Sequence, residues 1–178
     1  MRKAMLLVVV AVILQAVAPG PTEARVVRFV VEQTRTFAEG MSFGGVGPFL
    51  RLDGTVVIEV DPRDPLNAVI VNLDKAPKNA RGMVEFTSPF FILKPVDIAR
   101  GNGKIFHGVN NRGNKGHLAR YSLLPIGPNA NNPLTAADVN ADGLLMRLGY
   151  TYVDAGWQGD VAPGNDRQIG RASCRERV

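Results

Sequence analysis

Alternation of hydrophobic and polar residues predicts β-strands in the first half of the chain. In residues 25–32 β-branched residues alternate with polar or charged ones, and in residues 50–60 apolar residues hold nearly every second position. This period of two is typical of strands. A third β-prone segment, residues 83–94, contains Pro89 and is expected to be bent or bulged. The three segments predict an antiparallel meander with no strong helix.

The segments between these strands are rich in turn-forming residues. Residues 37–49 hold several glycines and a proline and are expected to form a loop, while the two prolines of residues 61–65 end the preceding strand. Residues 67–73 are compatible with a short strand or a helical turn. Residues 75–82 are polar and predict a loop.

The pattern changes near Lys104. Residues 104–110 form a compact strand candidate, residues 141–148 place three leucines at helical spacing before Gly149, and residues 150–155 again predict a strand. Strand, helix and strand make a βαβ unit, whose right-handed crossover brings both strand ends to one edge of the sheet. The predicted fold class is therefore mixed α/β. A β-rich N-terminal subdomain, residues 25–103, precedes the start of an α/β core, residues 104–168.

Residues 1–24 have the features of a signal peptide. Arg2 and Lys3 are followed by an unbroken apolar run, residues 5–14, and by small residues at Thr22 and Ala24. Ten apolar residues are about half of the roughly 20 that a membrane-spanning helix needs. Export with cleavage is therefore favoured over an uncleaved anchor. The expected location is periplasmic or extracellular, with no stable membrane span.

The other end of the chain is also unusual. Residues 169–178 resemble the conceptual translation of a common sequencing-library adapter. On that interpretation they are an artefactual tail, and the natural reading frame continues past Gln168. A basic tail that binds nucleic acid or a membrane is the weaker alternative. Three arginines, one glutamate and no aromatic residue provide little net positive charge for such binding.

Composition changes once both ends are set aside. The whole chain of 178 residues has a formal net charge of +5, whereas residues 25–168 carry 16 Lys or Arg and 14 Asp or Glu, a balance of +2, with no cysteine. This balance does not predict a nucleic-acid partner, which would require a basic face with aromatic residues between the charges. The absence of cysteine suits an exported chain.

Candidate chemistry lies in the two loops that follow the strands of the βαβ unit. The first loop combines amides, a guanidinium and a glycine, so its N–H groups are candidates to face an anion or a developing oxyanion; a simple polar turn is the alternative. In the second loop a tryptophan stands between glycines, where a buried packing role is the alternative. The candidate residues are Asn110, Asn111, Arg112, Gly113 and Asn114 in the first loop, and Gly156, Trp157, Gln158, Gly159 and Asp160 in the second.

Other catalytic and metal-binding groups are scarce. His107 and His117 are the only histidines, and either a structural or a catalytic role is open to both. No spacing of histidines, cysteines or carboxylates predicts a metal site, and no cofactor is expected. Of the serines in residues 25–168, only Ser42 lies in a Gly-x-Ser-x-Gly string, residues 40–44. That string falls within the predicted glycine-rich loop 37–49 and not between a predicted strand and a predicted helix, so no nucleophile elbow is expected.

A set of short motifs resembles a bacterial family of exported proteins called α/β-hydrolase domain-containing proteins. The resemblance covers most of residues 25–163, and the two loops are its most specific parts. The matching positions are Ser42-Phe43-Gly44, Gly47-Pro48, Leu50, Gly54, Asp61-Pro62, Asn67-Ala68-Val69-Ile70, Asn79-Ala80-Arg81-Gly82, Asn110-Asn111-Arg112-Gly113-Asn114-Lys115, Gly149-Tyr150 and Gly156-Trp157-Gln158-Gly159-Asp160.

The resemblance implies an N-terminal fragment of a secreted, serine-dependent hydrolase acting on a small-molecule or lipid-like ester. Asn111, Arg112 and Gly113 would then belong to the oxyanion-side loop, and residues 156–160 would line the pocket. The nucleophile, acid and histidine would follow later in the chain, so the fragment itself would be inactive. The alternative function is a secreted β-rich binding or structural module without catalysis.

Overall fold

The computed structural model describes residues 24–122, 131–132, 135–136, 143–164 and 166–172. The predicted signal peptide lies almost wholly outside these residues. The strands are β1 (Ala24–Thr36), β2 (Phe49–Val60), β3 (Val84–Pro95), β4 (Ile105–Gly108), β5 (Thr151–Ala155) and β6 (Arg171–Ala172), and the α-helices are α2 (Gly116–Ser122) and α3 (Leu144–Arg147). The 3₁₀ helices are η1 (Phe37–Gly40), η2 (Gly44–Val46), η3 (Pro65–Val69), η4 (Leu73–Lys75) and η5 (Ile98–Arg100).

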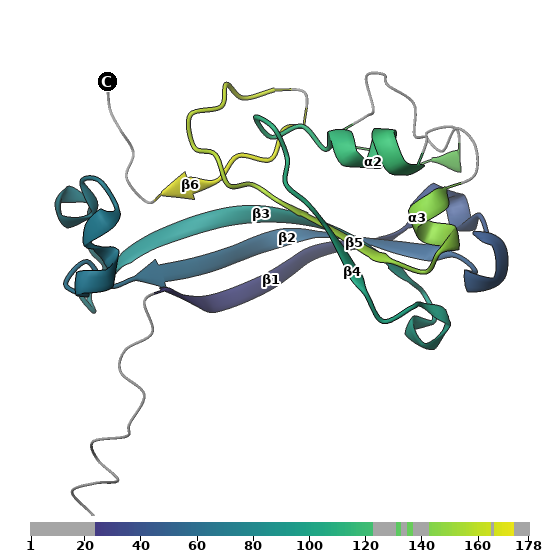
Figure 1. Cartoon of the computed structure of the whole chain (residues 1–178), viewed down its shortest axis with the longest axis horizontal. Helices are drawn as coiled ribbons and strands as arrows, with labels where there is room; N and C mark the ends of the chain where they lie inside the picture. The colour runs from purple at the N-terminus through teal and green to yellow at the C-terminus, as the bar shows by residue number, and fades with distance from the viewer. Residues whose placement is uncertain (1–23, 123–130, 133–134, 137–142, 165, 173–178) are drawn as a thin grey trace, which may run out of the picture.

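One mixed sheet organises the described residues, with strand order β1-β2-β3-β5-β4 (Figure 1). β1, β2, β3 and β5 pair antiparallel with their neighbours, whereas β4 and β5 pair in parallel. The two-residue strand β6, which lies in the segment interpreted above as an artefactual tail, also pairs with β3, beyond the end of β5. Strands of the first and second halves of the chain therefore lie in the same sheet.

The predicted α/β class is wrong. The described structure is β-rich, and its two α-helices, α2 and α3, are short. Three long antiparallel strands dominate the sheet, and the parallel pair β4–β5 is only four residues long. The error arose because a βαβ pattern in sequence specifies the direction of two strands and not the composition of the layer that covers them.

Local predictions agree with the structure to different degrees. The strand segments predicted around residues 25–32, 50–60, 83–94, 104–110 and 150–155 correspond to β1 to β5. Of the helix expected at 141–148, the structure describes α3, which begins later than predicted because Gly143 has a left-handed backbone (φ 55°). Residues 141–142 lie outside the described part. β3 pairs with β2 without a register shift, so the bulges lie instead in β1, beside Val27 and Glu32.

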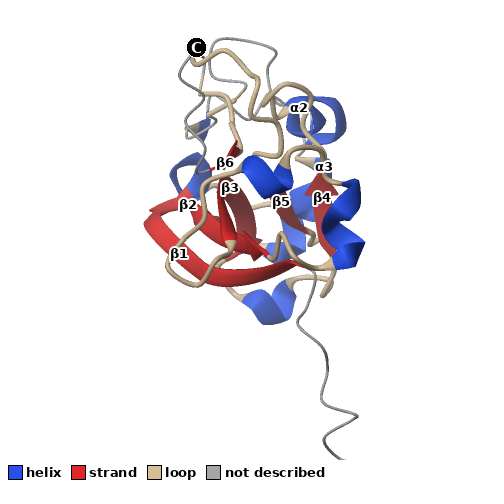
Figure 2. Ribbon diagram, turned by 90° about the vertical axis from the view of Figure 1, so that its left-hand side faces the viewer, coloured by secondary structure: helices blue, strands red, loops and turns tan. Residues whose placement is uncertain are grey.

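The core lies between one face of the sheet and the two helices (Figure 2). On this face Phe91 and Leu93 of β3 and Tyr152 of β5 are almost fully buried. Leu118 of α2, Met146 of α3 and the side chains of Phe37, Phe43 and Phe49 belong to the same cluster. The alternation of β2 and β3 thus places one set of side chains against the helices.

The opposite face of the sheet is apolar as well. It carries alternate residues of β2 and β3, among them Val56, Ile58 and Phe90, and the 54% exposed Phe29 of β1 stacks on Phe90 with ring centroids 4.4 Å apart. An antiparallel sheet with one solvated face normally presents polar side chains there. The apolar side chains on this face are therefore unusual for a sheet surface that no helix covers.

The Asn79–Gly82 motif has a structural role far from the two loops. Glu59, only 2% exposed in β2, accepts a hydrogen bond from Asn79 Nδ2 at 2.6 Å and a charge-assisted one from Arg81. Asn79 Oδ1 accepts from the N–H groups of Arg81 and Met83. The motif therefore neutralises a buried carboxylate and holds the turn before β3.

We predict that Gly54→Ala destabilises the sheet while Gly45→Ala does not. A Cβ atom on Gly54 would lie 2.0 Å from the Val30 carbonyl oxygen and 2.4 Å from Cζ of Phe90, whereas a Cβ atom on Gly45 has no neighbour within 4 Å. Chemical denaturation should show a loss of about 2 kcal/mol or more for Gly54→Ala and under about 0.5 kcal/mol for Gly45→Ala. Equal losses would contradict the close approach of β1, β2 and Phe90.

Candidate functional site

The two predicted loops meet at one edge of the sheet. Because β4 and β5 are parallel neighbours, the segments that follow them leave on the same side (Figure 1). Asn110, which is 1% exposed, joins them. Its Nδ2 donates to Asp154 Oδ1 at 2.7 Å and to the Ala155 carbonyl at 2.6 Å, while its own carbonyl accepts from Trp157 Nε1 at 2.7 Å.

The first loop is a tight hairpin turn. Asn111 and Asn114 form a β-bridge, and the Asn114 N–H donates to the Asn111 carbonyl at 3.1 Å. The two central residues, Arg112 and Gly113, have φ values of 50° and 76°. Successive positive φ values are those of a type I′ turn, which glycine adopts freely and arginine does not. Arg112 therefore holds a strained backbone conformation at the tip of the loop.

Gln158 and Asp160 of the second loop hold Arg112. The Arg112 N–H donates to Gln158 Oε1 at 2.6 Å, and its guanidinium donates to the Asp160 carbonyl at 3.3 Å. The Asp160 carboxylate lies 3.7 Å from the same guanidinium, and both side chains are more than half exposed. The ion pair between Arg112 and Asp160 is thus open to solvent.

The N–H groups of the first loop already have partners in this arrangement. The Gly113 N–H donates to Asn110 Oδ1 at 3.1 Å, and the Asn114 N–H donates within the turn. The Arg112 N–H is different because its acceptor is a side chain on the outer loop. Of these three donors, Arg112 N–H is the one whose acceptor is a partly exposed side chain, so a ligand oxygen can reach it by displacing Gln158.

Asp154 is a fully buried carboxyl at the end of β5. It accepts from Tyr152 Oη at 2.6 Å as well as from Asn110. With the Gln168 amide in the orientation that satisfies both its oxygen and its nitrogen, Gln168 also donates to Asp154 Oδ1 at 2.9 Å. Burial raises the pKa of Asp154, although the hydrogen bonds from Tyr152 and Asn110 and the charge of Lys115 oppose the shift. Burial, reinforced by Asp154, also raises the pKa of Tyr152, so its hydroxyl keeps the proton that it donates.

Lys115 is a buried cation next to this network. It is 4% exposed, and its ammonium donates to the Asn131 carbonyl and lies 5.1 Å from the centre of the Phe91 ring. The Arg51 guanidinium lies 4.7 Å from the same ring centre. Burial, with the nearby charge of Arg51, lowers the pKa of Lys115 to about 8, against the opposing effect of Asp154.

The second loop begins where three backbones pack closely. The Gly156 N–H donates to the Pro89 carbonyl at 2.9 Å, and the Gly156 carbonyl accepts from Ser88 Oγ at 2.5 Å. A Cβ atom on Gly156 would lie 3.0 Å from the backbone C atom of Gln168. Glycine is therefore required at position 156 for packing, apart from any part in chemistry.

A third segment, not foreseen from sequence, completes the site. The Gln168 N–H donates to the Gly113 carbonyl at 3.0 Å, and a Cβ atom on Gly113 would lie 2.6 Å from the Gln168 carbonyl oxygen. The expectation for Gly113 considered only its turn geometry. The sequence contains one sign of the buried network beneath these segments: Asp154 is an acidic residue that alternates with Tyr152 along a predicted strand, so both lie on the same face of the sheet.

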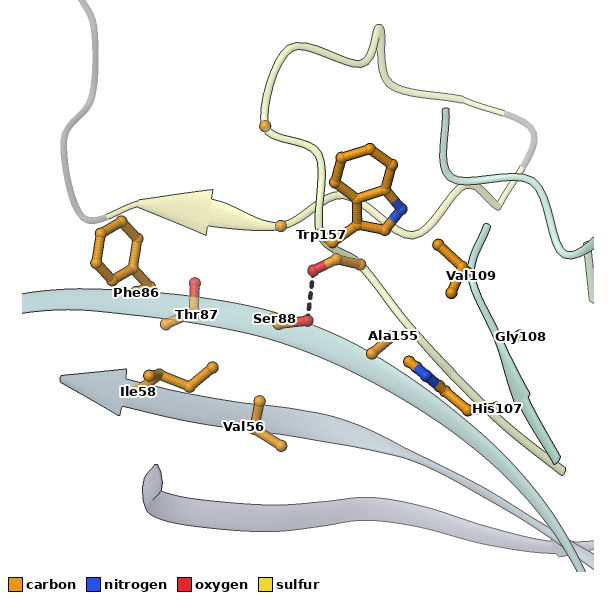
Figure 3. A pocket seen from close by; sticks show the side chains of 13 residues that line it. Val56, Ile58, Phe86, Thr87, Ser88, His107, Gly108, Val109, Ala155 and Trp157 are labelled. Carbon is orange, nitrogen blue, oxygen red and sulfur yellow. Dashed lines mark hydrogen bonds between the residues drawn. The ribbon is translucent and has the colours of Figure 1, made fainter. Parts of the chain in front are cut away.

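An apolar pocket of about 620 Å³ lies beside the second loop (Figure 3). It occupies the open face of the sheet, and Trp157, which is 61% exposed, borders it. Gly156 and Gly159 of the second loop also line it, whereas Gln158 and Asp160 are not part of its wall. The second loop therefore separates a polar contact zone around Arg112 from this apolar pocket.

The remaining candidate groups are dispersed. His107 lines the pocket, whereas His117 stacks on Tyr121 of α2 with ring centres 6.4 Å apart. Ser88 is engaged with Gly156, and Ser42 lies in the exposed turn before η2. Within the described residues there is no cluster of three histidines, cysteines or carboxylates suited to a metal ion.

Comparisons with known proteins do not identify the chain. No family model matches it, and neither a curated protein nor a solved structure is significantly similar to it. None of the helices that the structure describes has the length and apolar composition needed to cross a bilayer.

We predict that Asn110→Ala loosens the two loops and that Asn111→Ala does not. Loss of the Asn110 side chain removes one donor from Asp154 Oδ1 and leaves the Gly113 N–H without its acceptor, whereas the Asn111 residue is exposed. The free energy of unfolding should fall by about 2 to 4 kcal/mol for Asn110→Ala and by under about 0.5 kcal/mol for Asn111→Ala. Similar losses of unfolding free energy in both variants would contradict the central structural role of the Asn110 side chain.

We also predict that Lys115 makes stability depend on pH in alkaline solution. The folded protein releases this proton near pH 8 and the unfolded chain near pH 10.5, so the unfolded state binds more protons between these values. The free energy of unfolding should therefore rise with pH in that window by up to roughly 3 kcal/mol, relative to Lys115→Met. Urea denaturation at pH 7 to 10.5 measures the difference, and parallel profiles for the two proteins would contradict it.

Proposed function

We propose that the chain is the N-terminal part of an exported acyl hydrolase, and that its two loops form one wall of the substrate site. The nucleophilic serine and its acid and histidine partners would come from protein encoded beyond Gln168. The proposal concerns the chemistry of the loops and does not depend on the α/β class, which the structure contradicts. The motif resemblance supplies the reaction type.

The convergence of the two loops is the observation that carries this proposal. They are separated by more than 40 residues in sequence, yet Trp157 donates to the Asn110 carbonyl and the Arg112 N–H donates to Gln158. A buried hydrogen-bond network beneath them, centred on Asp154, holds them in place. Such rigid support beneath exposed polar groups is typical of sites that bind ligands.

In the proposed reaction these residues would bind and orient the substrate. Gln158 would leave the Arg112 N–H when the substrate carbonyl arrives, and that N–H would then donate to the oxygen on which negative charge develops. The Arg112 guanidinium would add favourable electrostatics at the same place. The strained backbone of Arg112 supports this role, because strain at a loop tip is retained where a fixed donor is needed.

A second candidate function is a secreted β-rich module that binds a ligand without catalysis. The N–H groups of Gly113 and Asn114 favour it, because both already donate within the protein. The apolar pocket on the open face gives such a module a place for a ligand. The two candidates differ in whether a nucleophile follows the described residues.

We predict that the longer protein, and not the 178-residue chain, reacts with a serine-directed probe. Reading the uninterrupted gene past the codon for Gln168 should reveal a further Gly-x-Ser-x-Gly motif, in addition to the string at residues 40–44. The product of that gene should then be labelled covalently by a fluorophosphonate probe and should hydrolyse p-nitrophenyl esters. Its matched control is the same protein with the motif serine replaced by alanine.

The opposite results identify the second candidate. A stop codon soon after Gln168, together with cooperative unfolding of residues 25–168 by themselves, would favour the non-catalytic module. A longer protein that contains the motif but resists the probe would also refute the proposed hydrolase.

A further inference from the structure

We propose that the pocket beside Trp157 binds an uncharged hydrocarbon chain of medium length. Identifying that chain as the acyl part of an ester rests on the proposed function, whereas its binding does not. The pocket lies on the face of the sheet opposite the helices, so it is separate from the buried network around Asp154.

The lining of the pocket selects an uncharged occupant. Side chains from four strands and their ends form its wall, and neither Asp, Glu, Lys nor Arg is among the described lining residues. A charged group placed there would lose hydration without gaining a partner. The apolar lining residues with the largest side chains are Val56, Ile58, Phe86, Val109 and Trp157 (Figure 3).

Trp157 gives the pocket a fixed aromatic border. Its indole N–H donates to the Asn110 carbonyl at 2.7 Å, so its polar atom is satisfied within the protein. The ring is nevertheless 61% exposed. A tryptophan that is held by its polar atom and exposes its apolar surface is prepared to contact a ligand with little loss of side-chain entropy.

The shape of the pocket favours a chain over a small group. Along β3 it reaches Phe86 from the level of Ala155, which pairs with Phe90. Four residues of a strand span about 13 Å. Ser88 Oγ, a polar group of the wall, already donates to the Gly156 carbonyl. An extended hydrocarbon therefore fits the length and the polarity better than an acetyl group.

The pocket lies next to the polar contact zone around Arg112. Gly156 and Gly159 line the pocket, and Gln158 between them accepts from the Arg112 N–H. A chain bound below the second loop would thus place its oxygen-bearing end near Arg112. This arrangement links hydrocarbon binding to the donor that the proposed function uses.

The test uses Trp157, the one tryptophan of the chain. The 178-residue chain is titrated with 1-decanol, a neutral probe that cannot be hydrolysed, and its tryptophan emission is recorded. A saturable blue shift is expected. 1-Butanol should need at least about tenfold higher concentration, since each buried CH₂ contributes about 0.8 kcal/mol. 10-Bromo-1-decanol should quench the emission, because a heavy atom quenches on contact.

Two matched substitutions locate the binding. Val56→Phe fills the pocket, whereas Val69→Phe makes the same change at an 84% exposed position in η3, away from the pocket. We expect at least about tenfold weaker binding of 1-decanol for Val56→Phe and no change for Val69→Phe. Circular dichroism verifies that both variants fold, and quenching of the unsubstituted chain provides a test that needs no variant.

Several results would overturn this inference. They are a response that does not saturate, equal weakening in both variants, no quenching by the brominated alcohol, and a dimer whose Trp157 emission is already blue-shifted and insensitive to 1-decanol. The last result would assign the face to a contact between two copies. If 1-decanol binds while the longer protein hydrolyses no ester, the inference stands and the proposed function fails; hydrolysis without such binding refutes the inference alone.

Discussion

The buried hydrogen bond between Asn110 and Asp154 is the interaction on which the candidate site depends. It joins the residues that follow β4 to the end of β5. The contacts of Trp157 with Asn110 and of Gln158 with Arg112 lie next to it. An amide is well suited to this position because it donates to the acid and to the Ala155 carbonyl while accepting from the Gly113 N–H. Leaving such groups unpaired inside the protein costs about 1 to 3 kcal/mol each, so this network admits few alternative arrangements.

The same region shows how the fold separates two kinds of surface. On one face of the sheet, helices α2 and α3 bury aromatic and aliphatic side chains around buried polar groups such as Asp154 and Lys115. The other face presents alternate apolar side chains of β2 and β3 with partial exposure. The second loop lies at the boundary, which explains how Trp157 can contact Asn110 through its N–H group and the apolar pocket through its ring.

Much of the strand content could be predicted from sequence because the apolar alternation in residues 50–60 and 83–94 is a local property. The positions of the two loops also followed from local signals, since both begin where strands end. Three features could not be found in this way. Helix α2 has only seven residues and little periodicity, the joining of all strands in one sheet is non-local, and the contact of Gln168 with Gly113 links residues more than 50 positions apart. The predicted α/β class was wrong for a related reason. One strand–helix–strand segment was taken to indicate a parallel sheet covered by helices, whereas most of the sheet is antiparallel and its helices are short.

The irregular pairing of β1 has a consequence for the behaviour of the protein in concentrated solution. This thirteen-residue strand forms an edge of the described sheet and exposes Val26, Phe29 and Val31. Such an edge invites a neighbouring molecule to add its own strand. The extra residues at Val27 and Glu32 interrupt the ladder at two points, so the amide groups of the edge do not form one continuous flat row. These two bulges therefore disfavour the addition of strands from neighbouring molecules, the step by which fibres would grow.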